Sequence, residues 1–109
     1  MKKGRRDHHS SFVALERKTL FKCEEWRQLS SRGKVFYLYL KAGYNGHNNS
    51  EIQLHFSELQ GLPDFHSRAS FYGAARELVR TGWIERANQG GLFRNANAYR
   101  LTGKYDAML

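Results

Sequence analysis

Residues 67–102 constrain the fold more than any other part of the chain. A helical pattern ends at GWIE (residues 82–85), a glycine-rich segment follows, and AYRLT (residues 98–102) then reads as a returning strand. Gly82 is suited to ending the helix, and the two runs around the glycine-rich segment are typical of a β-hairpin. We therefore expect a helix that leads directly into a two-stranded hairpin.

The same stretch is strongly basic. It carries two acids against six arginines, which are Arg68, Arg76, Arg80, Arg86, Arg94 and Arg100. The net charge of the whole chain, +8 at pH 7, is also uneven. Residues 1–34 carry ten Lys or Arg against four Asp or Glu, residues 35–66 carry one against three, and residues 67–109 carry seven against three. Basic flanks favour nucleic acid as the partner, ahead of an anionic membrane surface or an acidic protein.

Length and composition predict one soluble domain. A chain of 109 residues with 40% apolar content, including two Trp, six Tyr and seven Phe, can form a single hydrophobic core. No apolar run approaches the roughly 20 residues that span a bilayer, and the basic start is not followed by an apolar signal-peptide core. Cys23 is the only cysteine, which excludes an intrachain disulfide and a cysteine-based zinc site. We expect a cytoplasmic protein.

The N-terminal part of the sequence predicts a tail and two helices. Residues 1–11 are polar and basic and are expected to be a mobile tail, so that the fold begins near Phe12 with a short strand or an extended lead-in. A first helix is predicted over residues 19–29. A second is predicted over residues 31–43, with Ser30 or Ser31 as its cap. The apolar stripe of this second helix is expected to consist of Val35, Leu38, Tyr39 and Ala42.

The middle of the sequence predicts a helix-turn-helix unit. Residues 44–50 are rich in Asn and Gly and form a loop, and residues 52–54 alternate as a short edge strand. A single short helix is predicted over residues 56–60 and is stopped by Gly61 and the Leu-Pro-Asp turn after it. Another helix restarts near Ser67. In such a unit the second helix usually lies in the major groove of DNA.

Together these segments resemble the winged helix-turn-helix domains of bacteria and of their phages and plasmids. The matching pieces are WRQLS (26–30), GYNG (43–46), NNSEI (48–52), AARELVRTGWI (74–84) and AYRLT (98–102), whereas the turn PDFH (63–66) departs from the usual Gly-x-Ser spacing. The resemblance covers residues 12–103, between a basic tail (1–11) and a C-terminal tail (104–109). It implies an α+β fold with a three-helix core and a small antiparallel β-wing. It also implies duplex DNA binding by a transcriptional regulator or a replication-associated factor of a mobile element.

Helical phase divides residues 67–80 into a packed stripe and an open stripe. The packed stripe holds Phe71, Ala74, Ala75 and Leu78. DNA contacts are expected on the open stripe and its margins, from Ser67, Arg68, Ala69, Ser70, Tyr72, Gly73, Arg76 and Arg80. Arg76 can pair with a guanine edge or a phosphate, and the small residues permit close approach to a groove. The alternative is an ordinary solvated face, on which Glu77 would repel phosphate.

The hairpin and the N-terminal tail supply further expected contacts. Four residues with polar side chains in or beside the hairpin loop are suited to the DNA backbone or minor groove, namely Gln89, Arg94, Asn95 and Asn97. Arg86 and Arg100 lie on the strands and are weaker candidates. Four tail cations are expected to contact phosphates, namely Lys2, Lys3, Arg5 and Arg6. A plain polar loop and a solvated chain end are the alternatives.

The other aromatic and ionisable residues predict packing and not catalysis. Five aromatic residues are expected in the core, namely Trp26, Phe36, Tyr39, Trp83 and Tyr99. No HExxH, CxxC, GxSxG or phosphate-loop motif is present, and the histidines lack metal-ligand spacing. We expect no enzymatic activity, no metal and no cofactor. The expected partner is double-stranded DNA, bound by a monomer or a homodimer, and the rival hypothesis is a protein-interaction module that does not bind DNA.

Overall fold

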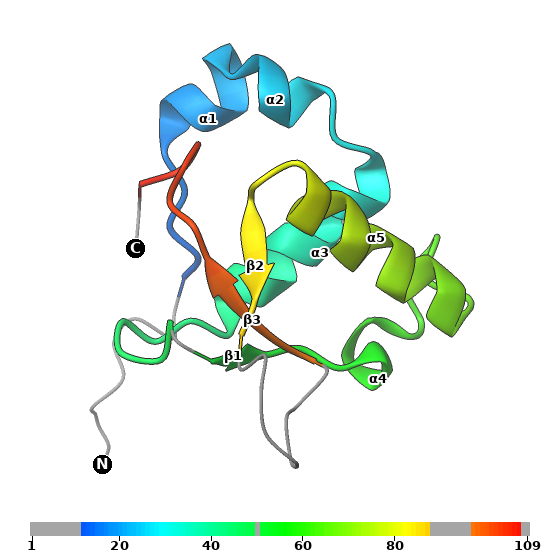
Figure 1. The fold of residues 1–109 in the computed structure, drawn as a ribbon. Coiled ribbons are helices and arrows are strands. Elements are labelled where there is room, and N and C mark those ends of the chain that lie inside the picture. Colours follow the sequence, from blue (N-terminus) through cyan, green and yellow to red (C-terminus); the bar gives the residue numbers. More distant parts are fainter. Residues whose placement is uncertain (1–11, 50, 88–96, 108–109) are drawn as a thin grey trace.

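The computed structural model describes residues 12–49, 51–87 and 97–107. Over these residues the chain is an α+β protein with five helices and a small three-stranded antiparallel sheet (Figure 1). The helices are α1 (Arg17–Lys22), α2 (Glu24–Arg27), α3 (Ser31–Ala42), α4 (Phe56–Leu59) and α5 (Arg68–Arg80), and the strands are β1 (Ile52–Gln53), β2 (Ile84–Arg86) and β3 (Ala98–Leu101). None of the described helices is long and apolar enough to cross a membrane.

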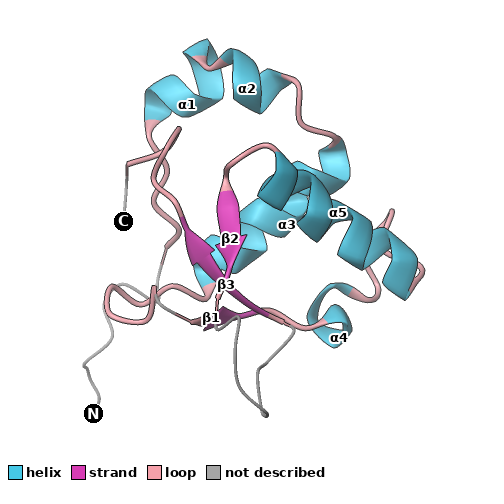
Figure 2. Cartoon of the chain, in the orientation of Figure 1, coloured by secondary structure: helices cyan, strands magenta, loops and turns pink. Residues whose placement is uncertain are grey.

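The sheet has β3 at its centre, between β1 and β2. Ile52 of β1 lies opposite Tyr99, and Glu85 of β2 lies opposite Arg100. β1 is the expected edge strand, and the backbone N–H of Leu54, just beyond it, donates to the Asn97 carbonyl oxygen at 3.0 Å. Figure 2 shows the strands gathered on one side of the α3 and α5 pair. None of the three described strands therefore covers the opposite side of α5.

The core forms where α3 and α5 pack together. Phe36 and Leu40 of α3 and Phe71 and Leu78 of α5 are fully buried, and the ring centroids of Phe36 and Phe71 lie 5.1 Å apart. Burying one side chain of this size stabilises a fold by roughly 1.5–3 kcal/mol. Phe71, Ala74, Ala75 and Leu78 are all buried, so the packed stripe predicted for this helix is confirmed.

The buried stripe predicted for α3 is wrong. The side chains that face the core are those of Phe36, Tyr37, Leu40 and Lys41, whereas Val35 and Leu38 are only half-buried and Tyr39 and Ala42 are exposed. Residues 35–40 are apolar all round the helix, so spacing alone does not select a face. The core takes the face with two adjacent aromatic rings, because such rings bury the most area. Tyr39 is 41% exposed, and the other four expected core aromatics are buried.

The single helix expected over residues 19–29 is in fact two short helices. α1 ends at Lys22, the backbone at Cys23 is extended, and α2 begins at Glu24. The guanidinium group of Arg27 donates to the Phe21 carbonyl oxygen at 3.2 Å. This bond satisfies one of the carbonyl groups that the end of α1 leaves open, which helps the chain to break here. Residues 12–15 form an extended lead-in and no strand.

The turn between α4 and α5 gives α5 a defined start. The chain passes through positive φ at Gly61 (140°) and at Asp64 (75°), and aspartate tolerates this region better than most residues. Ser67 then caps α5, because its Oγ accepts a hydrogen bond from the Ser70 N–H at 3.2 Å. At the other end Gly82 adopts a φ of 89°, as expected for a residue that ends a helix.

Residues 104–107, expected as a tail, pack onto α3 beside the N-terminal lead-in (Figure 1). The buried carboxylate of Asp106 accepts hydrogen bonds from Lys41 Nζ at 2.6 Å, Tyr37 Oη at 2.8 Å and the Glu16 N–H at 3.1 Å. Burial alone raises the pKa of Asp106, but these hydrogen bonds and the charge of Lys41 hold that pKa below its ordinary value. The folded region therefore extends past the expected boundary at residue 103.

Candidate nucleic-acid interface

The open stripe of α5 carries two arginines one turn apart. Arg76 and Arg80 are exposed, as is Ala69, while Gly73 is half-buried. Neither arginine forms a salt bridge with another described residue. Residues four apart on a helix are neighbours on its surface, so the two guanidinium groups emerge on the same side. The predicted phase of the open stripe is thus confirmed, and both charges remain available to an external anion.

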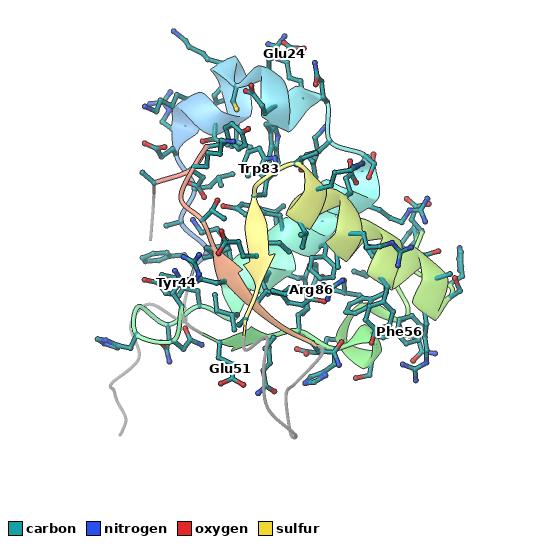
Figure 3. The ribbon with its side chains drawn as sticks, in the orientation of Figure 1. Glu24, Tyr44, Glu51, Phe56, Trp83 and Arg86 are labelled. Carbon is teal, nitrogen blue, oxygen red and sulfur yellow. The ribbon has the colours of Figure 1, made fainter. Side chains whose placement is uncertain are left out.

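A shallow hollow lies between the C-terminal half of α5 and β2. Its volume is about 450 Å³, and it is lined by Gly73, Arg76, Glu77, Val79, Arg80 and Arg86. Figure 3 shows Arg86 between β2 and α5. Three guanidinium groups from two elements therefore border one open hollow. Such an arrangement favours an anion, and the planar guanidinium matches the geometry of phosphate.

A second hollow continues the first toward the residues that follow β3. Its volume is about 580 Å³, and it shares Val79 and Arg86 with the first hollow and reaches Thr102 and Lys104. We call the two hollows together the basic groove. Its cations are Arg76, Arg80, Arg86 and Lys104, and its acids are Glu77 and Glu85. The groove follows the junction of α5 with the hairpin strands, where an extended polyanion could contact both elements.

The one acid of the α5 face, Glu77, is bonded to Ser30. The Glu77 carboxylate lines the first hollow but accepts hydrogen bonds from the Ser30 hydroxyl at 2.6 Å and the Ser30 N–H at 2.9 Å. Its charge therefore compensates the N-terminus of α3, where backbone N–H groups carry partial positive charge. The concern that Glu77 would repel phosphate is weakened by this geometry.

A buried tyrosine positions the Arg86 side chain. The Arg86 guanidinium carbon lies 5.8 Å from the centroid of the Tyr99 ring, within range of a cation–π contact. Burial raises the pKa of Tyr99, partly offset by the positive charge of Arg86, so the phenol stays neutral. By contrast, Arg100 is ion-paired with Glu85 across the two strands. Arg86 lines both hollows and is a candidate for anion contact there, whereas Arg100 lines neither.

Several side chains in the N-terminal part of α5 contact other residues of the chain, which the sequence does not predict. Ser67 Oγ lies 3.2 Å from Ser70 Oγ in addition to its capping bond, and Arg68 stacks over the Phe56 ring at 5.0 Å. Tyr72 Oη donates to Asn97 Oδ1 at 3.0 Å, which ties α5 to the start of β3. These candidates lie on the expected side of the helix, but several of their polar groups already have partners.

Seven of the expected contacts lie outside the described residues. They are the loop residues Gln89, Arg94 and Asn95 and the tail residues Lys2, Lys3, Arg5 and Arg6. Asn97 is described, and its side-chain oxygen accepts the hydrogen bond from Tyr72.

The sequence pattern ranks Arg86 as a weak candidate contact and does not indicate Lys104 at all. The signal for Arg86 is its position two residues after the buried Ile84, because alternate residues of a strand point to the same side. Lys104 has no comparable local signal, since it follows β3 in an irregular segment and reaches the groove only through the path of the folded chain.

Neither a metal centre nor a known relative identifies this surface. Among the described residues there is no group of three or more His, Cys, Asp or Glu side chains that could hold a metal ion. No protein-family model, curated protein or solved structure was found to match the chain. The basic groove and the open stripe of α5 are therefore the features of the described residues that indicate a function.

Proposed function

We propose that this chain is a winged helix-turn-helix protein that binds double-stranded DNA without catalysing a reaction. In this proposal α4 and α5 are the helix-turn-helix pair, α5 enters the major groove, and the hairpin that connects β2 to β3 lies along the DNA backbone. The order of α3, α4, α5, β2 and β3 supports the assignment, since it places the hairpin directly after the recognition helix. A regulatory or replication-associated role on a mobile element follows from the sequence resemblance.

The observation that carries the proposal is the convergence of Arg76, Arg80 and Arg86 on one open hollow. Two of these arginines have no salt bridge within the described residues, and the neighbouring acid, Glu77, is held by Ser30. Cations that converge on one open surface attract a polyanion. Lys104 extends the same positive surface along the groove.

The chemistry of the surface favours backbone contacts over base-by-base readout. The open stripe of α5 presents Ala69 and Gly73, which have no hydrogen-bonding side chain, and Ser67 and Ser70 bond to each other. Arginines at the groove can bind phosphates at any sequence. We therefore expect strong salt dependence and modest sequence discrimination.

Fluorescence anisotropy with a labelled duplex at several salt concentrations tests the proposal. We expect tight binding at low salt, weaker binding for Arg76→Ala, Arg80→Ala and Arg86→Ala, and a salt slope that falls by about 1 for each phosphate contact removed. Arg17→Ala is the matched control, since it removes an exposed cation from α1. Absence of binding at low salt, or equal binding by all variants, would refute the proposal.

The alternative is that the same scaffold binds a protein. Its support is Gly73, where an added Cβ would meet, among the described residues, only Arg76 Nη2 at 3.9 Å, so that a partner could approach α5 closely at this glycine. A partner that is retained after nuclease treatment and at high salt would favour this alternative. Selection of bound duplexes from a random pool would favour DNA, and the symmetry of the selected site would indicate the oligomeric state.

A further inference from the structure

The segment that follows β3 carries Lys104 to the end of α5. Gly103 turns the chain with a φ of 73°, and the Lys104 N–H donates to Thr102 Oγ1 at 3.2 Å. The Thr102 hydroxyl shares its proton between the carbonyl oxygens of Gly82 and Trp83, at 2.7 and 3.1 Å. A Cβ added at Gly82 would lie 3.5 Å from both Cδ and Nζ of Lys104. The lysine side chain therefore passes over the glycine that ends α5.

Buried groups outside the basic groove anchor the next two residues. The Tyr105 carbonyl oxygen accepts a hydrogen bond from Oγ1 of the fully buried Thr19 of α1, at 2.6 Å, and the Tyr105 and Trp83 ring centroids lie 4.7 Å apart. Asp106 is paired with the buried Lys41 of α3 at 2.6 Å. Figure 1 shows the chain after β3 leading toward α1. We call residues 102–106 the strap, since they are held both before and after Lys104.

The ammonium group of Lys104 lies on the surface of the groove. Lys104 is exposed, lines the second hollow and forms no salt bridge with another described residue. Its Nζ lies 5.2 Å from the centroid of the Tyr105 ring, a contact that restricts the side chain and leaves its charge in place. The acid of this hollow, Glu85, is paired with Arg100. A cation that is already held in position loses less freedom when it binds an anion.

We propose that the strap positions Lys104 to bind a backbone phosphate of DNA next to the phosphate bound by the arginines of the first hollow. The inferred contact rests on the proposed DNA binding and extends it to the segment after β3. The two hollows share Val79 and Arg86, so a strand that meets Arg76 in the first can pass Arg86 and reach Lys104 in the second. An ammonium group binds phosphate as a compact point charge. Thr19 and Asp106 are then positioning residues, which act on DNA only through the strap.

A purely structural role for Lys104 has different consequences. Its ammonium lies near the C-terminus of α5, where carbonyl groups carry partial negative charge, and a cation at this end stabilises a helix. If Lys104 does only this, Lys104→Ala lowers the stability of the fold and leaves the duplex affinity of the folded protein unchanged.

Anisotropy titrations with a labelled duplex at several salt concentrations test the contact. We expect Lys104→Ala to weaken binding and to lower the salt slope by about 1, and Lys104→Arg to restore most of the affinity. Lys22→Ala is the matched control, because it removes an exposed lysine of α1 that lines neither hollow. Binding that weakens for Arg76→Ala but not for Lys104→Ala would overturn the inferred contact and leave the proposed function standing. A wild-type chain that does not bind the duplex would refute both.

A double-mutant cycle tests the positioning by the strap. Thr19→Val keeps the shape of a buried side chain that lines neither hollow and removes its hydrogen bond to Tyr105. We expect faster hydrogen exchange at residues 104–107 and duplex binding weaker by at least about two-fold, with no further weakening in the Lys104→Ala background. Asp106→Asn, which removes the stronger anchor, should show the same pattern, and thermal unfolding identifies the temperature range in which each variant is folded. Unchanged affinity for both variants, or equal weakening in both backgrounds, would overturn the positioning role.

Discussion

The Glu77 carboxylate of α5 accepts two hydrogen bonds from Ser30 at the start of α3, from Oγ at 2.6 Å and from the backbone N–H at 2.9 Å. Ser30 Oγ in turn accepts the Gly33 N–H at 3.0 Å, so it caps α3 while it is held by α5. A Cβ added at Gly33 would lie 2.6 Å from Glu77 Oε1. The glycine therefore gives the carboxylate the space to reach the cap, and the two main core helices are joined at this point.

Replacing Glu77 by alanine should destabilise the fold. The change leaves the Ser30 N–H without its partner and removes a negative charge from the N-terminus of α3, which together cost about 1–2 kcal/mol. Urea denaturation should show the loss. Glu85→Ala is the control, because its exposed ion pair with Arg100 is worth about 1 kcal/mol or less. Equal losses for the two variants would contradict the role assigned to Glu77.

Replacing Gly73 by alanine should raise the stability of the protein and weaken its binding to DNA. A Cβ at this position meets no atom of the described residues closer than 3.9 Å, so the change should stabilise α5 by about 0.5–1 kcal/mol. If the DNA groove approaches α5 here, the same change should weaken duplex binding. Thermal unfolding and anisotropy measure the two effects.

The reverse change on the same stripe, Ala69→Gly, is the control for this experiment. Ala69 is exposed in the first turn of α5, so the loss of its Cβ should lower stability without hindering a close approach of DNA. If Gly73→Ala stabilises the protein and leaves DNA binding unchanged, the groove does not approach α5 at this glycine.

The contrast between α5 and α3 shows how far the sequence predicts the fold. In α5 the apolar residues lie on one stripe and the opposite stripe is polar or small, so helical phase identifies both the packed and the open side. In α3 residues 35–40 are apolar on every side, and the buried face depends on which side chains meet Phe71 and Trp83 in the folded chain. Local periodicity contains no information about that choice.

The candidate site is likewise predictable from the sequence only in part. Arg76 and Arg80 are found from periodicity because they belong to one helix. The basic groove itself joins α5 to Arg86 of β2 and Lys104 beyond β3, and the Glu77 carboxylate at its edge is bonded to Ser30, 47 residues earlier. Contacts between residues so far apart follow from tertiary packing, which spacing along the chain does not specify.

Replacing Asp106 by asparagine should destabilise the fold, because it breaks a buried ion pair. The change leaves Lys41 buried without its carboxylate, and breaking such a pair costs about 3–5 kcal/mol. Burial raises the Asp106 pKa, but hydrogen bonding outweighs burial and lowers it below the ordinary value of 3.8. The ionised carboxylate therefore stabilises the fold fully at pH values above 3.8. That contribution is lost as pH falls through the lower pKa of the folded state. Wild-type stability should therefore approach that of the variant in acid, as followed by urea denaturation at several pH values.

Asp64→Asn is the control for the acid dependence. Asp64 is exposed at positive φ, where asparagine is tolerated equally well, so this change should alter neither the stability at neutral pH nor the acid slope appreciably. If the difference between the wild type and Asp106→Asn stayed constant down to strongly acidic pH, the lowered pKa of Asp106 would be refuted.

Replacing Tyr72 by phenylalanine should loosen the link between α5 and the hairpin. Tyr72 Oη donates to Asn97 Oδ1 at 3.0 Å, just before β3, and a hydrogen bond of this kind contributes about 1 kcal/mol. Hydrogen exchange should show faster opening of residues 97–101, and duplex binding should weaken if the hairpin contacts the backbone. Tyr39→Phe, at an exposed ring on α3, should change neither quantity. Faster exchange with unchanged affinity would mean that the hairpin packs against α5 but takes no part in binding DNA.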